Sequence, residues 1–502
     1  MRNESELLPI VRPAGSNLPT VESGQNFAWP AVAAAPNLAA SDVLDDKNLR
    51  ATAVRFIDDY WQKLIRVELK SRGSLLGLPK PYVVPGGRFD EGYYWDSFFI
   101  MLGLTRADKW DLIRDIIDDL AFTLKKYGLI PTANRTYYLG RSQPPLLSWM
   151  VKLLAEKFGD PMLLKYLPAL IREHNFWMKG VERLNEPGAA RRRVVKVEGG
   201  ILNRYWADRR GPRFEQKSRD RQTAANVRRP NRLFTNLRAG AESGWDFSSR
   251  WLDDDCELAS IRTADILPVD LNCLLYDLEK TIATGFRKLG QTENSDEFFQ
   301  KAAARRDLIQ RYFWHSADGF YYDYDFVRKN QTGRKTLAAL FPLRSKISDK
   351  DQAGKVAARI GREFLATGGL KTTLRATAQQ WDAPNGWAPL NWIAVGALQN
   401  YGHSALAGEI KARWIRTCLS CFARTGKFYE KYNVVRPEIP ATGGEYPLQT
   451  GFGWTNGVLR DLLDGPFGPR LKNYAEAEAH YLKASSKALL KIMSKMGTST
   501  MR

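Results

Sequence analysis

Apolar residues recur at helical spacing through most of the chain. Between Val54 and Leu64 they fall at positions i, i+3, i+7 and i+10, which places them on one face of a helix. Three further segments show the same stripe: Leu147–Phe158, Phe298–Phe313 and Trp392–Leu406. Alternating apolar and polar positions are rare, and the clearest run, Phe320–Phe326, predicts a small hairpin. The pattern therefore predicts an all-α fold.

Periodicity fades at both ends of the chain. Residues 1–49 are rich in Pro, Ala, Ser and Asn, and we predict an extended N-terminal arm that is partly disordered. Residues 466–502 are basic and have Ala, Leu, Glu and Lys at helical spacing, which predicts a C-terminal helix or frayed tail. The helical pattern between these ends predicts one folded domain over residues 50–465.

Long segments rich in Gly, Pro and aromatic residues separate the predicted helices. They read YVVPGGRFDEGYYWD, RTYYLGRSQPP, ESGWDFSSRW, QQWDAPNGWAPLNW and GGEYPLQTGFGWTNG. Loops of this length in a compact helical protein are usually functional. Aromatic rings mixed with Arg, Asp, Glu and Gln suit a ligand that has apolar faces and a polar rim. A sugar and a nucleobase both meet that description.

The chain is strongly basic for an ordinary globular composition. Its 502 residues include 75 Lys and Arg against 55 Asp and Glu, which gives a formal net charge of +20. No segment approaches the roughly 20 consecutive apolar residues of a membrane span, so we expect no membrane partner. The charge raises a nucleic acid or another polyanion as one hypothesis. The basic blocks Arg191–Arg193, Arg204–Arg238 and those beyond Arg470 fit a solvated surface more simply.

Several common catalytic sites lack their usual residues. Only four His are present, and no pair has the H-x-x-x-H spacing of a zinc protease. Cys418 and Cys421 form a single C-x-x-C, which we interpret as helix packing, with a redox or metal role as the alternative. There is no G-x-S-x-G, no phosphate-binding loop and no clean G-x-G-x-x-G. Serine triads, nucleotide hydrolysis and dinucleotide redox chemistry therefore lack their usual residues.

Carboxylates in the aromatic loops are the remaining candidates for chemistry. They are Asp96, Asp246, Asp382, Glu430 and Glu445, each beside an aromatic residue or a glycine pair. A carboxyl group against an aromatic wall is desolvated, which raises its pKa and keeps a proton on it near neutral pH. A second, better hydrated carboxylate stays ionised and can activate water. Glycoside hydrolysis requires this pairing of two carboxyl groups.

Two long motifs resemble the signatures of a known family. Pro85–Asp96 (PGGRFDEGYYWD) resembles the first signature of the α,α-trehalases, and Gln380–Pro389 (QWDAPNGWAP) resembles the second. Between and after them come RSQPP, SGWDFSSRW, PVDLN, EKY and GGEYPLQ, in the family's order. The resemblance covers about residues 50 to 465. It implies an inverting glycoside hydrolase built as an (α/α)6 barrel, a six-hairpin toroid with its site in long loops at one end.

The resemblance also implies roles for individual residues. Asp246 matches the general acid that protonates the glycosidic oxygen, and Glu430 matches the general base that activates water. In an inverting enzyme the two carboxyl groups lie about 6.5–9.5 Å apart, and trehalose would give one α- and one β-glucose. The resemblance implies that no metal and no cofactor is needed, which agrees with the few His and Cys residues. The residues that match sugar contacts are Arg88, Trp95, Asp96, Thr132, Arg141, Ser142, Gln143, Arg213, Glu215, Gly244 and Glu445. The arginines would donate to hydroxyl groups and would hold Glu430 ionised, whereas the acidic residues would accept.

The chain departs from the family pattern at four places. Thr132 stands where the family usually has a sugar-binding Asn, and Phe214 replaces a Pro. The Gly run before Glu445 is shorter than in many members, and the family's N-terminal D-x-K-x-F stretch is not evident. None of these departures removes the acid, the base or a core arginine. The sequence leaves open whether Trp381–Asp382 and Trp387 line the pocket or support its loops.

The leading hypothesis is hydrolysis of α,α-trehalose, a neutral small molecule, to two glucose molecules. Thr132 suggests an (α/α)6 hydrolase of another α-glucoside as an alternative, and the charge suggests a polyanion-binding protein. The first residues show no basic segment followed by an apolar stretch. We therefore expect a cytoplasmic protein, or a periplasmic or secreted one if the true N-terminus is missing. We expect a monomer that binds neither nucleic acid nor membrane.

Overall fold

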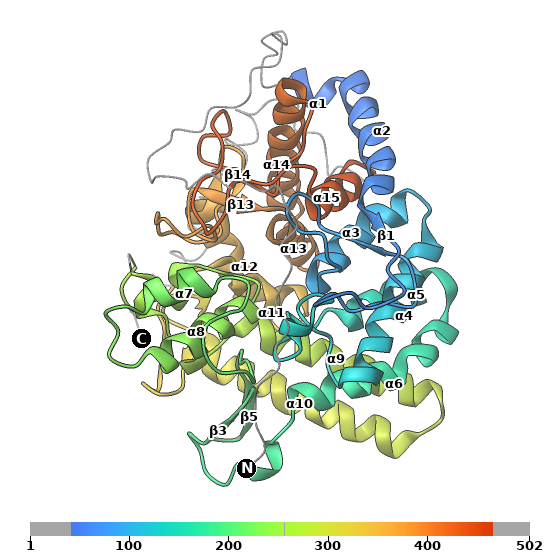
Figure 1. Ribbon diagram of the computed structural model, residues 1–502. Coiled ribbons are helices and arrows are strands. Elements are labelled where there is room, and N and C mark those ends of the chain that lie inside the picture. Colours follow the sequence, from blue (N-terminus) through green and yellow to red (C-terminus); the bar gives the residue numbers. More distant parts are fainter. Residues whose placement is uncertain (1–41, 256, 465–502) are drawn as a thin grey trace, which may run out of the picture.

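Helices form most of the computed structural model, which describes residues 42–255 and 257–464 (Figure 1). The α-helices of these residues are α1 (Asp42–Asp45), α2 (Lys47–Leu64), α3 (Tyr94–Arg106), α4 (Trp110–Tyr127), α5 (Leu147–Phe158), α6 (Asp160–Trp177), α7 (Lys217–Thr223), α8 (Pro230–Glu242), α9 (Val269–Lys288), α10 (Thr292–Phe313), α11 (Phe341–Arg344), α12 (Lys350–Arg359), α13 (Ala388–Gln399), α14 (Ser404–Thr425) and α15 (Gly453–Asp464).

The strands of the described residues are short and pair antiparallel in small sheets. The two-stranded sheets are β1 (Ile65–Arg66) with β2 (Tyr82–Val83), β7 (Trp314–His315) with β8 (Phe320–Tyr321), β11 (Leu365–Ala366) with β12 (Gly369–Leu370), and β13 (Asn385–Trp387) with β14 (Lys431–Asn433). The three-stranded sheets are β3 (Ala190–Arg191), β4 (Val194–Val197) and β5 (Gly200–Asn203), and β6 (Ile266–Leu267), β9 (Tyr324–Asp325) and β10 (Asn330–Gln331), with β9 central. The predicted all-α class is therefore confirmed.

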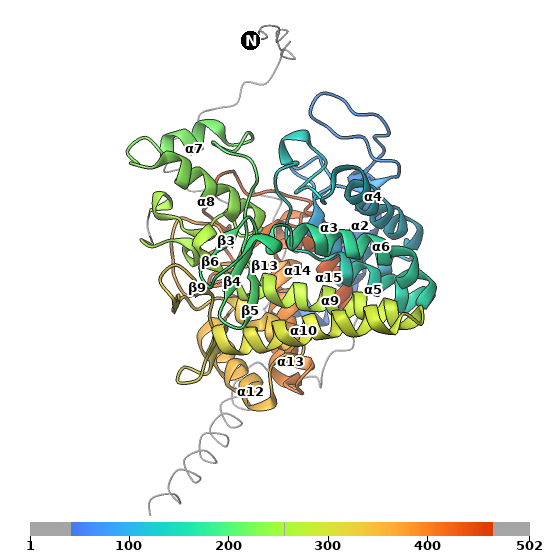
Figure 2. The same ribbon diagram turned by 90° about the horizontal axis from the view of Figure 1, so that it is seen from below.

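Six helices form a closed inner ring. α3, α5, α9, α11, α13 and α15 each pack against the next in that order, and α15 packs against α3. The helices α2, α4, α6, α10, α12 and α14 alternate with the ring helices along the chain (Figures 1 and 2). Four of them, α4, α6, α10 and α14, pack against the ring helix that they follow, and α2 packs against α15. This alternation of outer and inner helices is the predicted (α/α)6 toroid.

Burial separates the inner helices from the outer ones. Every residue of α3 from Tyr94 to Leu104 is buried, because an inner helix has neighbours on all sides. The outer helix α4 buries one stripe between Ile113 and Leu124, and its opposite face carries charged residues. The hydrophobic core therefore lies within the ring and between the ring and its outer helices.

Connections at the two ends of the ring differ in length. The links from an inner helix to the next outer helix are short: residues 107–109, 159, 289–291, 345–349 and 400–403. The links from an outer helix to the next inner helix are long: residues 65–93, 128–146, 178–268, 314–340, 360–387 and 426–452. All the long links therefore meet at the N-terminal ends of the inner helices. The longest of them carries α7, α8 and the β3–β4–β5 sheet (Figure 1).

The apolar stripe of Trp392–Leu406 does not form one helix as predicted. α13 ends at Gln399 and α14 begins at Ser404. Between them Gly402 has φ +79°, a left-handed conformation that glycine adopts without strain, and its N–H donates to the Gln399 carbonyl at 3.1 Å. The apolar spacing continues through the turn because both helices bury their facing sides.

The predicted hairpin of Phe320–Phe326 is also wrong. β8 pairs with β7, whereas β9 pairs with β6 and β10, so the segment contains strands of two different sheets. Asp323, between the two strands, is buried in an ion pair with Arg250. Because Asp323 is held by this ion pair, the chain passes from the sheet of β8 to the sheet of β9 at this residue and forms no hairpin turn between the two strands.

Only the last residues of the predicted N-terminal arm are described. Residues 42–45 and 47–49 are helical, in α1 and the start of α2, and not extended as predicted. The Asp46 side chain caps α2 by accepting from the Leu49 N–H at 2.9 Å. Residues 1–41 of the arm and the basic tail lie outside the described residues. The division of the chain into an arm (1–49), a folded domain (50–465) and a tail (466–502) therefore stays a prediction. No helix in the described ranges combines the length and hydropathy needed to cross a bilayer.

Candidate active site

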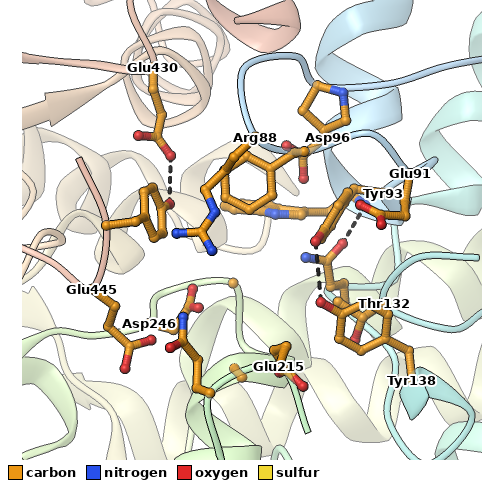
Figure 3. A pocket seen from close by; sticks show the side chains of 18 of the residues that line it. Arg88, Glu91, Tyr93, Asp96, Thr132, Tyr138, Glu215, Asp246, Glu430 and Glu445 are labelled. Carbon is orange, nitrogen blue, oxygen red and sulfur yellow. Dashed lines mark hydrogen bonds between the residues drawn. The ribbon is translucent and has the colours of Figure 1, made fainter. Parts of the chain in front are cut away.

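One cavity lies among the long links at the N-terminal ends of the inner helices (Figure 3). Except for Ser142, all the site residues predicted from the sequence line it: Arg88, Trp95, Asp96, Thr132, Arg141, Gln143, Arg213, Glu215, Gly244, Asp246, Glu430 and Glu445. Ser142 lies behind the wall, where its N–H donates to Glu242 at 2.8 Å and its carbonyl accepts from Thr132 at 2.8 Å. Folding therefore gathers residues from several distant links into one site.

Glu430 directly precedes β14 and is fixed by its backbone. Its N–H donates to the Gln449 carbonyl at 3.0 Å, and its carbonyl accepts from the Trp454 indole at 2.9 Å. The Tyr446 hydroxyl donates to Oε1 at 2.6 Å, whereas Oε2 is buried without a hydrogen-bond partner among the described residues. One carboxyl oxygen is thus held by the protein, and the other is left for water or a ligand.

The surroundings of Glu430 differ from those expected of a well-hydrated base. Glu430 is 1% exposed, and burial raises the pKa of its carboxyl group above the ordinary value. The Lys431 ammonium and the Tyr446 hydroxyl act in the opposite direction, and Arg88 adds a smaller effect. The structure therefore corrects two expectations. The carboxyl group is desolvated, and the main charge that favours its ionised form is a lysine, not an arginine.

Asp246 follows α8 and faces Glu430 from the opposite side of the cavity (Figure 3). Its backbone carbonyl accepts a hydrogen bond from Gln380 Nε2 at 2.6 Å. Desolvation and then the negative charge of Glu445 raise the pKa of its carboxyl group to about 7, against the lowering effect of Arg213. Near neutral pH a large fraction of Asp246 is therefore protonated and can donate a proton.

The two buried arginines of the site differ in the donors that they leave free. Arg213 donates to both oxygens of Glu445 at 2.8 and 3.0 Å and to Asp220 at 2.6 Å, so its guanidinium is occupied. Arg141 pairs with Glu215, and its Nε and Nη1 atoms are buried without partners among the described residues. Arg141 therefore has donors for a ligand, whereas Arg213 orients Glu445.

Tryptophans form the apolar part of the wall. Trp381 stacks on Trp387 with ring centroids 4.0 Å apart and on Trp245 at 5.5 Å. Trp95 and Trp454 pack against Trp381 at 5.7 and 6.2 Å. All of these rings except that of Trp245 line the cavity. Trp381 and Trp387, which the sequence left open, are therefore lining residues.

Asp382 has a different position from its tryptophan neighbours. Its buried carboxylate accepts hydrogen bonds of 2.6 to 2.9 Å from the hydroxyl groups of Ser248, Ser249, Thr373 and Thr377. It does not line the cavity. Asp382 therefore joins the loop after Asp246 to the link before α13 and supports the wall from behind.

The cavity also contains residues that the sequence analysis did not assign to it: Pro85, Phe89, Glu91, Tyr93, Tyr137, Tyr138, Gln216, Ala241, Tyr446, Phe452 and Trp454. Tyr446 matters most because its hydroxyl contacts Glu430. It directly follows Glu445 in the GGEYPLQ motif, and Trp454 lies in GFGWTNG. Their positions inside these motifs are the sequence signal that could have assigned Tyr446 and Trp454 to the site.

The described residues contain no group of three His, Cys, Asp or Glu placed to hold a metal ion. Cys418 and Cys421 are both buried on α14, as predicted for helix packing. Burial raises the pKa of both thiols, which keeps them protonated at neutral pH.

Comparison with known proteins identifies the family. Residues 23–465 match the sequence family described as Trehalase. The chain belongs to this family. Periplasmic trehalases of Citrobacter koseri and Pseudomonas aeruginosa are 49% and 48% identical to it over 414 and 412 residues. These matches cover 81% of this chain and 72% and 75% of the two relatives, respectively. The resemblance inferred from the motifs is therefore confirmed.

Solved structures agree with the trehalase assignment. The neutral trehalase Nth1 from Saccharomyces cerevisiae has a TM-score of 0.64 at 27% identity, and the match covers 80% of this chain and 75% of that one. The GH63 mannosylglycerate hydrolase from Thermus thermophilus has a TM-score of 0.53 at 18% identity, covering 82% and 99%. The second likeness concerns the fold alone, and both support the (α/α)6 toroid.

The expected cytoplasmic location is wrong. The two trehalases at 48–49% identity are periplasmic. The expectation rested on the residue pattern at the start of the sequence, a short local signal. Similarity over four-fifths of the chain carries more weight than that signal.

Thr132, which replaces the usual trehalase Asn, keeps its hydroxyl group within the protein. Oγ1 donates to the Ser142 carbonyl at 2.8 Å, and the Thr132 N–H donates to the Arg141 carbonyl at 3.1 Å. The hydroxyl proton is therefore used inside the protein, and the side chain has no donor left for a ligand.

Proposed function

We propose that this chain is an α,α-trehalase that hydrolyses trehalose to two glucose molecules with inversion, with Asp246 as general acid and Glu430 as general base. One observation carries the assignment of the residues: two carboxyl groups from different links face each other across one cavity (Figure 3). The pKa of one is raised to about 7, and the other has an oxygen without a partner among the described residues. Membership of the trehalase family supports the substrate.

Each carboxyl group moves one proton. Asp246 donates its proton to the oxygen between the two sugar rings while the bond from that oxygen to one anomeric carbon breaks. Glu430 Oε2 takes a proton from the water that attacks this carbon from the opposite face. One sugar leaves as α-glucose, and the other gains the water oxygen with inversion as β-glucose. Exchange with solvent then restores both groups.

The remaining wall residues fit a neutral sugar. Trp95 offers apolar surface to the cavity, and the unpartnered Nε and Nη1 of Arg141 can donate to hydroxyl groups. Burial raises the pKa of Asp96 well above its usual value, and the charges of Glu430 and Asp246 add to this effect. Burial therefore favours the protonated form of Asp96, which can both donate and accept hydrogen bonds.

The rate is expected to follow a bell-shaped pH profile. As the pH falls through the raised pKa of Glu430 the base becomes protonated, and above about pH 7 Asp246 loses the proton that it must donate. The alkaline limb is therefore expected near pH 7, and the acidic limb above the ordinary Glu value of about 4.3. Measurement of kcat/KM between about pH 4 and pH 9 tests both limbs. A constant rate across the alkaline half of this range would contradict the role of Asp246.

Gly244→Ala is expected to disturb Trp95. Gly244 has φ +75°, and a Cβ atom there would lie 2.8 Å from the Trp95 ring. The backbone strain costs about 1–2 kcal/mol, and displacement of Trp95 should lower kcat/KM by about tenfold or more. Gly128→Ala is the matched control, because Gly128 has φ +76° and a Cβ atom added there would meet no other atom within 4 Å. Thermal unfolding and kinetics of both variants separate the two effects, and equal kcat/KM values would remove Trp95 from the site.

A substrate panel tests the proposal against hydrolysis of another α-glucoside. We expect kcat/KM for trehalose to exceed that for maltose and kojibiose by at least about 10²-fold. A preference for either of the other disaccharides would favour the alternative suggested by Thr132. The measurement is glucose release by the purified protein.

Burial of several arginines weakens the hypothesis that the basic stretch binds a polyanion. Arg204, Arg213 and Arg238, in the most basic stretch, are buried at 7%, 1% and 6% exposure. Arg204 donates to the Ala264 carbonyl and Arg238 to the Gly211 carbonyl, so both are used inside the protein. These side chains are not available to bind phosphate groups on a surface.

A periplasmic location and a monomeric state complete the proposal. The relatives at 48–49% identity support the location. Osmotic shock of producing cells should release the activity with a periplasmic marker enzyme, and retention with a cytosolic marker would contradict it. The proposed catalytic residues lie in one cavity of one chain, so the reaction proposed here needs no second subunit. Light scattering after size-exclusion chromatography should give the mass of one chain.

A further inference from the structure

A buried lysine lies behind the catalytic carboxyl groups and has no part in the mechanism above. Lys431 and Gln380 are each 1% exposed, and neither lines the cavity. The Lys431 ammonium donates to Gln380 Oε1 at 2.8 Å and to the Gly443 carbonyl at 3.1 Å. Its Nζ lies 5.2 Å from the Trp387 ring centroid, and Trp387 pairs with Lys431 across β13 and β14. The lysine therefore joins the link before α13 to the loop before Glu445.

Gln380 extends this connection to the general acid. Its Nε2 donates to the backbone carbonyl of Asp246 at 2.6 Å and to the Tyr446 hydroxyl at 3.4 Å. The Tyr446 hydroxyl in turn donates to Glu430 Oε1 at 2.6 Å. Hydrogen bonds thus run without a break from the backbone of the acid to the side chain of the base, and Lys431 anchors Gln380 at the centre.

Lys431 also supplies the main positive charge that acts on Glu430. The titratable and charged groups around this part of the site are Lys431, Tyr446, Arg88, Asp96 and Asp246. Burial raises the pKa of Glu430, and Lys431 comes first among the groups that lower it. Burial lowers the pKa of Lys431 to about 8, against the effects of Glu430 and Asp246, so at pH 7 it is mostly an ammonium.

We infer that Lys431 is a positioning residue for the reaction. Through Gln380 it fixes the backbone of Asp246 relative to Glu430, and its positive charge stabilises the Glu430 carboxylate. The inference rests on the proposed function. Lys431 lies outside the cavity and touches no reacting atom, so it acts on the chemistry through Gln380 and Glu430.

Lys431→Met tests the inference because methionine keeps an unbranched apolar side chain and removes the ammonium. We expect kcat for trehalose to fall by about 10²-fold, since a catalytic group displaced by about 1 Å loses roughly that much rate. KM should change by less than about threefold. The acidic limb of kcat/KM should move to higher pH, because Glu430 loses the charge that favours its ionised form. The alkaline limb, which Asp246 sets, should move less.

Lys411→Met is the matched control for loss of a buried lysine. Lys411 is 4% exposed on the outer helix α14, and burial lowers its pKa too. Its charged neighbours are Asp461, Arg50 and Arg106, none of which lines the cavity. This variant should lower thermal stability and leave both limbs of the pH profile in place.

Gln380→Met gives a second test of the positioning role, which applies even if Lys431→Met does not fold. It leaves the lysine in place and removes the amide that donates to Asp246. We expect kcat to fall with KM nearly unchanged, and the acidic limb to move less than in Lys431→Met.

The possible failures are distinguishable. If the wild type is active and folded Lys431→Met keeps kcat within about threefold and an unchanged acidic limb, the inference is overturned. Wild-type kcat in Gln380→Met overturns it as well when Lys431→Met is unfolded. A wild type that releases no glucose from trehalose overturns the proposed function itself.

Discussion

Asp246→Asn is expected to lower kcat for trehalose by about 10³-fold, because the leaving sugar must then depart without a proton. Asparagine has the size of the carboxylic acid but no acidic proton near neutral pH. α-Glucosyl fluoride needs no such proton, since fluoride leaves as a stable anion. Its hydrolysis should therefore fall by no more than about tenfold. Steady-state kinetics of the variant and the wild type on both substrates measure this difference.

Glu430→Gln is the matched comparison. Both substrates need an activated water, so this variant should lose about 10³-fold in kcat on trehalose and on the fluoride alike. Wild-type turnover of trehalose by Asp246→Asn would contradict the assignment of the acid. Wild-type turnover of the fluoride by Glu430→Gln would contradict the assignment of the base.

The largest effect on stability is expected from Arg250→Met. Arg250 is 1% exposed and donates to both oxygens of Asp270 at 2.8 Å and to those of Asp323 at 2.7 and 3.0 Å. Its guanidinium also lies 4.5 Å from the ring centroid of Trp245, the residue before Asp246. Methionine leaves two carboxylates buried without a cation, which costs about 3–5 kcal/mol. The midpoint of thermal unfolding should fall by several degrees.

The pH dependence and a control identify the cause of this loss. Burial and the charge of Asp270 raise the pKa of the Asp323 carboxyl group, and Arg250, which the variant lacks, is the charge that lowers it. The destabilisation is therefore largest at high pH and is relieved as the pH falls and Asp323 gains a proton. Arg328→Met removes an exposed partner of Asp253 and should change stability by no more than about 1 kcal/mol. An equal loss in both variants would contradict the account.

Features that depend on residues close together in the chain, such as helices and motifs, could be predicted from the sequence. The apolar stripe of Leu147–Phe158 has the same bounds as α5, because amphipathic spacing depends only on nearby residues. The motifs around Asp246 and Glu430 place both residues in loops, and the alternation of outer and inner helices brings those loops to one end. The cavity therefore contains nearly every residue that the motifs suggested.

Contacts between distant residues could not be predicted in this way. Arg213 resembles a sugar donor in sequence, yet it bonds to Glu445, 232 positions away. Lys431 and Gln380 are 51 positions apart, so their contact cannot be read from either motif alone. The desolvation of Glu430 arises from side chains of several links packed around it. Such effects depend on the assembled structure and explain why the base was expected to be better hydrated than it is.

The configuration of the first glucose molecules released from trehalose tests the central claim most directly. Proton NMR distinguishes the α and β anomers if enough enzyme is used to finish the reaction before they interconvert. The account predicts equal amounts of α- and β-glucose, because water enters opposite the bond that breaks while the other sugar keeps its configuration. Release of α-glucose alone would contradict inversion, and with it the roles of Asp246 and Glu430.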